Sequence, residues 1–235
     1  MSSIVIASLS WHLPDGTPLF ENLDLTFGPV RTGLVGRNGI GKTTLLRLIA
    51  GEIAPTAGKV TSPGSMGFLC QNPEQQAEST LADLFGVQEQ LAILARAAAG
   101  AATEADLAKA DWSLEQRLEM ALTNTGLDRL QLDAPLGSLS GGQRTRAGLA
   151  ALMFAAPDVL LLDEPTNHLD RAGREHVVDA LRAWPGWVIV ASHDRSLLGA
   201  MDAIVELTTL GARSDGGGYD AYRATKSAEI APAES

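Results

Sequence analysis

Short apolar segments separated by turn residues open the chain. Residues 4–9 and 23–27 are apolar or alternating runs on either side of the turn-rich stretch 13–18, a pattern that predicts antiparallel strands. Residues 32–35 form a further predicted strand that leads into a glycine-rich loop, and residues 42–50 carry leucine and isoleucine at the spacing of a buried helix. The N-terminal region therefore predicts strand, loop and helix in direct succession.

Helical spacing dominates the middle of the chain, and apolar runs return after it. Residues 80–130 are rich in alanine and leucine, with an interruption at 99–101, which predicts a helical subdomain. Residues 158–163 contain the unbroken apolar run of a strand that is buried on both faces. The remaining predicted elements are strands at 58–60, 66–70, 187–191 and 203–207, and helices at 143–155 and 171–183.

This alternation of strands and helices predicts an α/β fold with a mostly parallel core sheet. We expect one domain over residues 1–213, with an antiparallel β subdomain at its N-terminus and an inserted α-helical subdomain over about residues 72–138. Residues 214–235 are rich in glycine and alanine and predict a partly disordered tether or the start of an interdomain linker.

Composition narrows the class of protein. The 235 residues are 45% apolar, enough for one substantial core, and their net charge of -10 argues against a surface that binds nucleic acid throughout. Local basic patches remain possible. The single cysteine, Cys70, has no partner for an intrachain disulfide, so we expect a reduced cytoplasmic setting. No apolar run approaches the roughly 20 residues that span a bilayer, so a membrane role would need another chain to supply the span.

A phosphate-binding loop follows the third predicted strand. Its residues fit the G-x-x-x-x-G-K-[ST] pattern and are Gly36, Arg37, Asn38, Gly39, Ile40, Gly41, Lys42 and Thr43. Glycines let backbone N–H groups curl around a phosphate at a helix N-terminus, Lys42 would reach the β and γ phosphates, and the Thr43 hydroxyl would bind Mg²⁺. We include Thr44 in the nucleotide-binding set. A glycine-rich turn before an unrelated helix is the alternative.

Two acids end the predicted strand at 158–163. Asp163 is suited to the Mg²⁺ shell, and Glu164 to a general base that polarises an attacking water. Pro165 then directs the chain off the strand. An ordinary strand end with solvated acids is the alternative, and the phosphate loop upstream favours the functional interpretation.

The segment Leu139-Ser140-Gly141-Gly142-Gln143 is identical to the signature motif of ATP-binding cassette (ABC) ATPases. The resemblance implies a P-loop NTPase of the ABC class that hydrolyses MgATP. Ser140, Gly141, Gly142 and Gln143 open a helix, so their hydroxyl and N–H groups can face an anion. In the family that anion is the γ phosphate held by a second cassette, which implies two cassettes packed head to tail around ATP.

Further positions match the family residue by residue. Gln71 resembles the glutamine that senses Mg²⁺ and the γ phosphate, and His193 resembles the switch histidine that contacts the γ phosphate. Asp170 resembles the aspartate that couples two sites across a dimer. Trp11 lies 25 positions before Gly36, where the family places an aromatic residue that stacks on adenine. A core aromatic is the alternative for Trp11.

Finer features resemble the ABC-F class, soluble proteins with two tandem cassettes that act on the ribosome or in antibiotic resistance. Asn167-His168 stands where transporter cassettes usually carry a serine-alanine type pair, and the segment from Gly217 to Arg223 resembles the one that leads from a first cassette into the interdomain linker. We therefore expect the first half of an ABC-F protein, with a second cassette as partner in tandem or as a homodimer. Contact with the ribosome and its RNA is implied by the resemblance alone, because acids outnumber bases over residues 80–133.

Two other functions remain open from the residues. One is the ATPase motor of a membrane transporter, which would bind a permease. The other is a nucleotide-gated binding module with negligible turnover. For hydrolysis we expect in-line attack of water on the γ phosphate, with Glu164 as base, His193 orienting the phosphate, and Lys42 and Mg²⁺ stabilising charge. Gln71 joins Thr43 and Asp163 as an expected Mg²⁺ contact.

Overall fold

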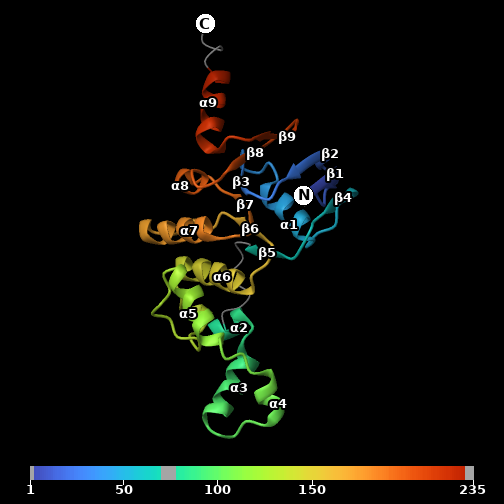
Figure 1. Ribbon diagram of the computed structural model, residues 1–235. Coiled ribbons are helices and arrows are strands. Elements are labelled where there is room, and N and C mark those ends of the chain that lie inside the picture. Colours follow the sequence, from blue (N-terminus) through green and yellow to red (C-terminus); the bar gives the residue numbers. More distant parts are fainter. Residues whose placement is uncertain (1–2, 70–77, 231–235) are drawn as a thin grey trace. The chain divides into compact units, whose positions relative to one another are not determined.

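A computed structural model describes residues 3–69 and 78–230 (Figure 1). The chain forms two compact units, and each is described by itself. The first combines residues 1–71, 157–167 and 181–235, and the second combines residues 72–156 and 168–180. Strands belong to the first unit, while the second is helical within the described residues.

A six-stranded sheet is the centre of the first unit. Its strands, in spatial order, are β5 (Met66–Leu69), β6 (Val159–Asp163), β7 (Trp187–Ala191), β3 (Arg31–Gly36), β8 (Ala203–Thr208) and β9 (Gly211–Asp215). Neighbouring strands from β5 to β8 are parallel, and β9 pairs antiparallel with β8. All of β6 is buried, as its apolar run predicts. The expected α/β fold with a mostly parallel sheet is confirmed.

A three-stranded antiparallel sheet is also part of the first unit. Its order is β2 (Pro18–Phe27), β1 (Ile4–His12) and β4 (Ala57–Thr61). Leucine, isoleucine and phenylalanine from this sheet share one buried cluster with helix α1 (Lys42–Ala50) and with the inner face of the six-stranded sheet. Burial of this apolar area is what holds the two sheets and α1 together.

The second unit consists of helices and contains a separate apolar cluster. Its helices are α2 (Leu81–Phe85), α3 (Gln88–Ala98), α4 (Glu104–Lys109), α5 (Leu114–Asn124), η2 (Leu136–Ser138), α6 (Gly141–Ala155) and most of α7 (Arg171–Ala183). The buried residues of the cluster lie in α2, α5, η2 and α6 and in the segments beside them. Leu81 and Leu118 are buried in the cluster, and Phe85 meets Phe154 edge to face with ring centroids 5.5 Å apart.

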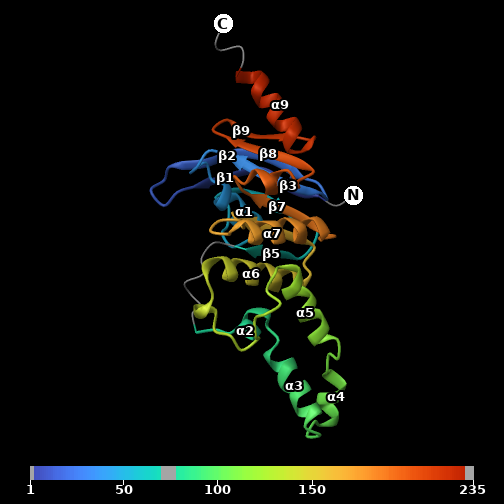
Figure 2. The same cartoon turned by 90° about the vertical axis from the view of Figure 1, so that its left-hand side faces the viewer.

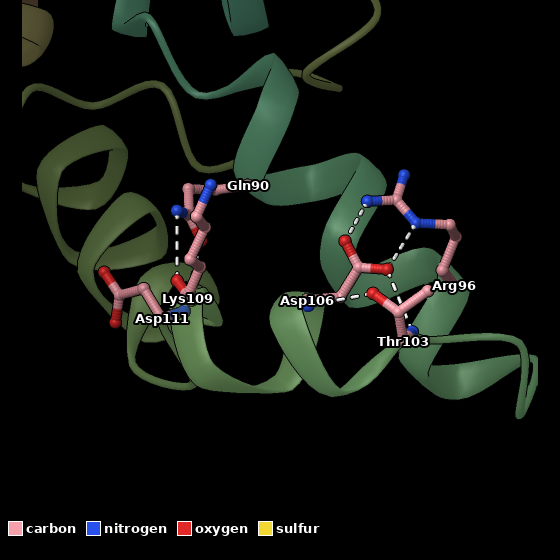
Figure 3. A network of polar contacts seen from close by, with 6 residues as sticks. All are labelled: Gln90, Arg96, Thr103, Asp106, Lys109 and Asp111. Carbon is pink, nitrogen blue, oxygen red and sulfur yellow. Dashed lines mark hydrogen bonds and ion pairs between the residues drawn. The ribbon is translucent and has the colours of Figure 1, made fainter.

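A polar network joins α3 to α4 and to the start of α5 (Figure 3). Arg96 forms an ion pair with Asp106, and Asp106 also caps its own helix by accepting the Thr103 N–H at 3.0 Å. The hydrogen bonds from Arg96 make the largest contribution, and with the Thr103 N–H they hold the pKa of the Asp106 carboxyl well below its ordinary range. Gln90 donates to the Lys109 carbonyl and accepts the Asp111 N–H. Polar contacts therefore hold α4, which buries no residue, while α3 also buries Ile93.

The end of the chain differs from the expectation. Within the region expected as a partly disordered tether or the start of an interdomain linker, strand β9 continues to Asp215 and helix α9 spans Gly218–Ile230 (Figure 2), so the described part is ordered, and its role as a linker stays a prediction. The Lys226 ammonium binds the Glu206 carboxylate on β8 at 2.7 Å, which docks α9 against the sheet. The glycine-rich composition at 216–218 concealed this helix, because it marks the turn that starts the helix rather than a tether.

One ion pair ties the start of β3 to the loop before β8. The Arg31 guanidinium binds both carboxylate oxygens of Asp202, and the two backbones bond through Asp202 N–H and the Arg31 carbonyl at 2.8 Å. These side-chain hydrogen bonds lower the pKa of the Asp202 carboxyl below its ordinary value of 3.8. The Asp202 carboxylate therefore contributes all of its stabilisation of the folded state above pH 3.8. This contribution is lost as the pH falls through the lower pKa that the carboxyl has in the folded state.

We expect Asp202→Asn to lower the free energy of unfolding at pH 7 by roughly 0.5–1 kcal/mol, because both partners are partly exposed and solvent screens the pair. The difference between variant and parent should shrink once the pH falls below about 3.8, where the carboxyl is protonated in the unfolded chain. Urea unfolding at several pH values measures this. A difference that stays constant down to pH 2 would contradict the assignment.

Candidate nucleotide site

The phosphate loop lies between β3 and α1, as its sequence pattern predicts. Gly36 has a φ of 155°, and a Cβ there would come within 2.7 Å of the Leu207 carbonyl. Gly41 has a φ of 105°, and a Cβ there would meet the Phe20 ring at 2.7 Å. Both glycines are therefore required by packing and Gly41 also by backbone conformation. The loop leaves Arg37, Asn38 and Gly39 exposed, with Ile40 and Thr44 half-buried.

Lys42 points back across this loop. Its ammonium donates to the Gly36 carbonyl at 2.9 Å and lies 3.2 Å from Nε2 of His193. Burial lowers the pKa of this ammonium from 10.5, while the charges of Glu164 and Asp163 oppose that shift. The side chain is therefore a desolvated cation at the mouth of an anion-binding loop, which is the arrangement a phosphate requires.

Thr43 and Asp163 form the second pair in the site. The Thr43 hydroxyl donates to Oδ2 of Asp163 at 2.8 Å, and the Asp163 carboxylate is buried. The pair consists of a hydroxyl and a carboxylate, which are the oxygen ligands that Mg²⁺ accepts alongside phosphate oxygens and water. The donor set therefore fits Mg²⁺. Gln71, the third expected Mg²⁺ contact, lies outside the described residues.

Glu164 directly follows β6, and its backbone has a left-handed conformation with a φ of 47°. A non-glycine residue in this region is strained, and here its N–H donates to the Ala191 carbonyl of β7 at 2.8 Å. The carboxylate accepts from the Ser192 hydroxyl at 3.3 Å and lies 3.6 Å from Nε2 of His193. Glu164 is largely buried, whereas His193 is half-exposed, so the histidine ring faces an opening.

Parallel pairing explains why residues distant in sequence meet here. Asp163 of β6 is the register partner of Ala191 of β7, so the residues that follow each strand end at the same edge of the sheet. The structure thus brings together Lys42, Thr43, Asp163, Glu164 and His193, all of which the sequence singled out. Of the predicted catalytic residues, Lys42, Glu164 and His193 lie next to one another, and Gln71 lies outside the described residues.

Ser192 is a site residue that the sequence reasoning did not select. It is fully buried, donates to Glu164 and accepts the Asp194 N–H at 3.1 Å. Its position directly after a buried strand and directly before His193 was the available signal. Ser192 acts through Glu164 and is a positioning residue.

The signature residues lie in the second unit. Ser140 is the N-cap of α6 and forms a capping box with Gln143, whose side chain accepts the Ser140 N–H at 2.9 Å. Ser140 and Gly141 are exposed, and Gly142 is half-buried beside Leu169. The helix start that the motif predicts is present. The capping box uses the N–H groups of Ser140 and Gln143, and anion binding at this helix start stays a prediction.

Two further expectations concern Asp170 and Trp11. The Asp170 carboxylate accepts the Gly173 N–H at 2.8 Å and so caps the start of α7. Trp11 is half-buried, pairs with Phe20 across β1 and β2, and packs on the main apolar cluster. Its partial exposure keeps both interpretations open, an adenine-stacking ring and a core aromatic.

Comparison with known proteins decides the family. The family described as ABC transporter matches residues 20–167, which include the phosphate loop, the signature segment and the acidic strand end. The chain belongs to the ATP-binding cassette family. It is therefore an ABC ATPase cassette that binds nucleotide.

Curated relatives include two ABC-F proteins. The chain is 35% identical over 242 residues to the tylosin resistance ATP-binding protein TlrC of Streptomyces fradiae, covering 92% of this chain and 44% of TlrC. It is 32% identical over 237 residues to the energy-dependent translational throttle protein EttA of Mycobacterium tuberculosis, covering 91% of this chain and 42% of EttA. The chain thus spans less than half of either relative.

A solved cassette shares the fold. The ATP-binding cassette MJ0796, in a dimeric post-hydrolysis state bound to ADP and Pi, matches with a TM-score of 0.73 at 20% identity. The match covers 91% of this chain and 98% of that one. The ABC fold therefore extends over nearly all of this chain.

We expect Ser192→Ala to lower kcat for ATP hydrolysis by about tenfold and to leave KM within about twofold. The variant removes one hydrogen bond to a carboxylate, and such a bond contributes on the order of 1.5 kcal/mol, a factor of roughly ten. Steady-state phosphate release measures both constants. Ser192→Thr keeps the hydroxyl and should restore kcat; equal activity in the alanine variant and the parent would exclude a positioning role.

Proposed function

We propose that this cassette binds MgATP and hydrolyses it after pairing head to tail with a second cassette. The observation that carries the proposal is the convergence of Lys42, Glu164 and His193, with Nε2 of the histidine 3.2 Å from the ammonium and 3.6 Å from the carboxylate. Such a cluster supplies a cation, a base and an orienting group within reach of one phosphate.

Each of these side chains has one task in the proposed mechanism. Glu164 accepts the proton of the water that attacks the γ phosphate in line, and Ser192 fixes the carboxylate that accepts it. Lys42 stabilises charge on the β and γ phosphates, and His193 donates to the γ phosphate. Thr43 and Asp163 would hold Mg²⁺, which neutralises charge on the phosphate oxygens when bound.

The phosphate loop provides half of the proposed site. Ser140 and Gly142 open α6 with exposed or half-exposed donors, and in the proposed sandwich these donors face the γ phosphate bound by the opposite cassette. ATP then contributes part of the interface between two cassettes. The dimeric state of MJ0796 supports such pairing by analogy of fold.

We further propose that the chain is the first half of an ABC-F protein that acts in translation or in antibiotic resistance. The Asn167-His168 pair and the tyrosine-rich start of α9 support this class, as do the names of TlrC and EttA. The second candidate is the motor of a membrane transporter, favoured by the matching family's description. In residues 3–69 and 78–230 no helix has the length and apolarity needed to cross a bilayer.

We expect Glu164→Gln to reduce ATP turnover by about 10²–10⁴-fold, because the amide cannot accept the proton of the attacking water. The same variant should form an ATP-dependent dimer that persists, since hydrolysis no longer separates the cassettes. Phosphate release measures turnover, and sedimentation with and without ATP measures association. Lys42→Ala is the matched control and should bind no ATP.

Two outcomes of that experiment would contradict the proposal. Turnover that is already negligible in the parent, and unchanged in Glu164→Gln, would favour a nucleotide-gated binding module without catalytic use of Glu164. A variant that binds ATP and stays monomeric at saturating ATP would refute self-association of this chain.

We expect the gene to continue beyond the codon for Ser235 into a charged helical linker and a second Leu-Ser-Gly-Gly segment, since TlrC and EttA are each more than twice as long as the matched region. Sequencing the locus tests this. A stop codon at that point beside a permease gene, together with co-purification of a membrane protein, would favour the transporter motor.

A further inference from the structure

Helix α6 carries a half-buried arginine in its second turn, shortly after the signature residues. Arg146 donates to the Thr125 carbonyl at 3.0 Å and to the Gly126 carbonyl at 2.8 Å, in the loop after α5. Thr125 is fully buried, and its hydroxyl lies within hydrogen-bond distance of the carbonyls of Ala121 and Leu122 in α5. The two carbonyls that accept from Arg146 are therefore a fixed part of the fold.

The same loop also meets α7. Gly126 has a φ of 68°, and a Cβ there would lie 2.5 Å from the His176 ring and 2.9 Å from the Arg146 guanidinium. A side chain at this position would displace both groups, and its backbone would be strained as well. Helix α6 lies between α5 and α7 in both views (Figures 1 and 2), and the loop after α5 gives it a contact that reaches α7.

A second close approach joins the signature segment to the start of α7. A Cβ on Gly142 would lie 3.0 Å from the Leu169 side chain and 3.4 Å from the His168 carbonyl. Leu169 is buried, and the next residue, Asp170, caps the start of α7. Helix α6 is thus tied to α7 and its start at two places, directly at Gly142 and through the loop at Arg146. Two contacts fix a direction as well as a position.

The energetics of Arg146 favour a geometric role over a purely stabilising one. Its Nε is buried and has no hydrogen-bond partner among residues 3–69 and 78–230. A buried donor that is left unpaired opposes folding, and exchange of a buried charged group for an apolar one of similar volume is often neutral or stabilising. The two hydrogen bonds that the guanidinium does make are directional, so orientation is what this arginine contributes.

We infer that Arg146 is a positioning residue for ATP-dependent pairing: it holds α6 so that the signature residues and Asp170 meet a second cassette as one surface. The inference rests on the proposed head-to-tail sandwich. Arg146 acts through α6 rather than on the nucleotide. Because the phosphate loop belongs to the first unit, loss of Arg146 should weaken pairing and leave the binding of ATP to a single cassette intact.

The test uses the Glu164→Gln chain as parent, in which hydrolysis does not separate the cassettes. Sedimentation over a series of ATP concentrations gives the concentration that half-saturates dimer formation. Monomer affinity for ATP is measured at protein concentrations too low for dimers. Arg146→Met loses both hydrogen bonds and keeps an unbranched side chain. It should need about ten times more ATP to dimerise, the effect of one hydrogen bond from a charged group, and its monomer affinity should stay within about twofold of the parent.

Leu118→Val is the control for stability. It removes a methylene group from the apolar cluster of the same unit and none of the hydrogen bonds of Arg146. This variant should lower the midpoint of urea unfolding and still dimerise at the ATP concentration that the parent needs. A residue that matters only for stability would not show this separation of pairing from unfolding.

A matched pair of glycine variants tests the loop after α5 independently. Gly126 and Gly100 have φ values of 68° and 70°, so alanine strains the backbone equally at either position. Nothing lies within 4 Å of a Cβ on Gly100, whereas a Cβ on Gly126 displaces the Arg146 guanidinium. Gly126→Ala alone should therefore raise the ATP concentration needed for dimers.

The remaining outcomes separate the positioning role from the proposed function. An Arg146→Met variant that dimerises like its parent would overturn the positioning role and leave the sandwich standing. The same holds if Leu118→Val loses pairing in proportion to its lost stability, as Arg146→Met does, or if Gly126→Ala and Gly100→Ala need equal ATP. A parent that binds ATP and never dimerises would overturn the sandwich, and the positioning role with it.

Discussion

Parallel pairing of β6 with β7 is the constraint on which the site depends. It brings Asp163 and Glu164 to the same sheet edge as Ser192 and His193, and β3, paired to the other side of β7, delivers the phosphate loop to that edge. Three segments far apart in sequence thus present their polar residues at the carboxyl ends of neighbouring strands, where α/β sheets commonly bind ligands. Apolar residues fill β7 and the first four positions of β6, so Asp163 is the one polar side chain that these two strands bury.

Charge is arranged differently in the two units. In the first, the acids of the site surround one desolvated lysine, and burial and carboxylates act on its pKa in opposite directions. In the second, Arg96 and Arg117 are engaged with Asp106 and Asp111. Of the two cations in α3 and α4, Arg96 is therefore paired, and Lys109 is exposed.

Glycine makes close packing possible on both sides of the proposed sandwich. Gly36 and Gly41 admit the Leu207 carbonyl and the Phe20 ring against the phosphate loop, and Gly142 admits Leu169 against the start of α6. Each contact fixes one segment of the backbone. In the proposed sandwich, the N–H groups of these segments face phosphate oxygens. Preorganised donors of this kind need no rearrangement when the charged ligand arrives, which is the reason such loops bind anions well.

Local patterns in the sequence determined much of this protein. The unbroken apolar run of β6 predicts a strand buried on both faces, the glycine spacing predicts the phosphate loop, and the segment from Leu139 to Gln143 predicts a capped helix start. These features depend on near neighbours in the chain, so side-chain periodicity and backbone freedom reveal them.

Only the tertiary structure decided the rest. The role of Ser192 depends on the distance between its hydroxyl and Glu164, 28 positions away, and the docking of α9 depends on the Lys226–Glu206 pair across 20 positions. The loop after α5 is held by Arg146, which donates to the Thr125 and Gly126 carbonyls 21 and 20 positions away. Such contacts join residues that no local pattern relates, since they arise from how the packed elements meet in space.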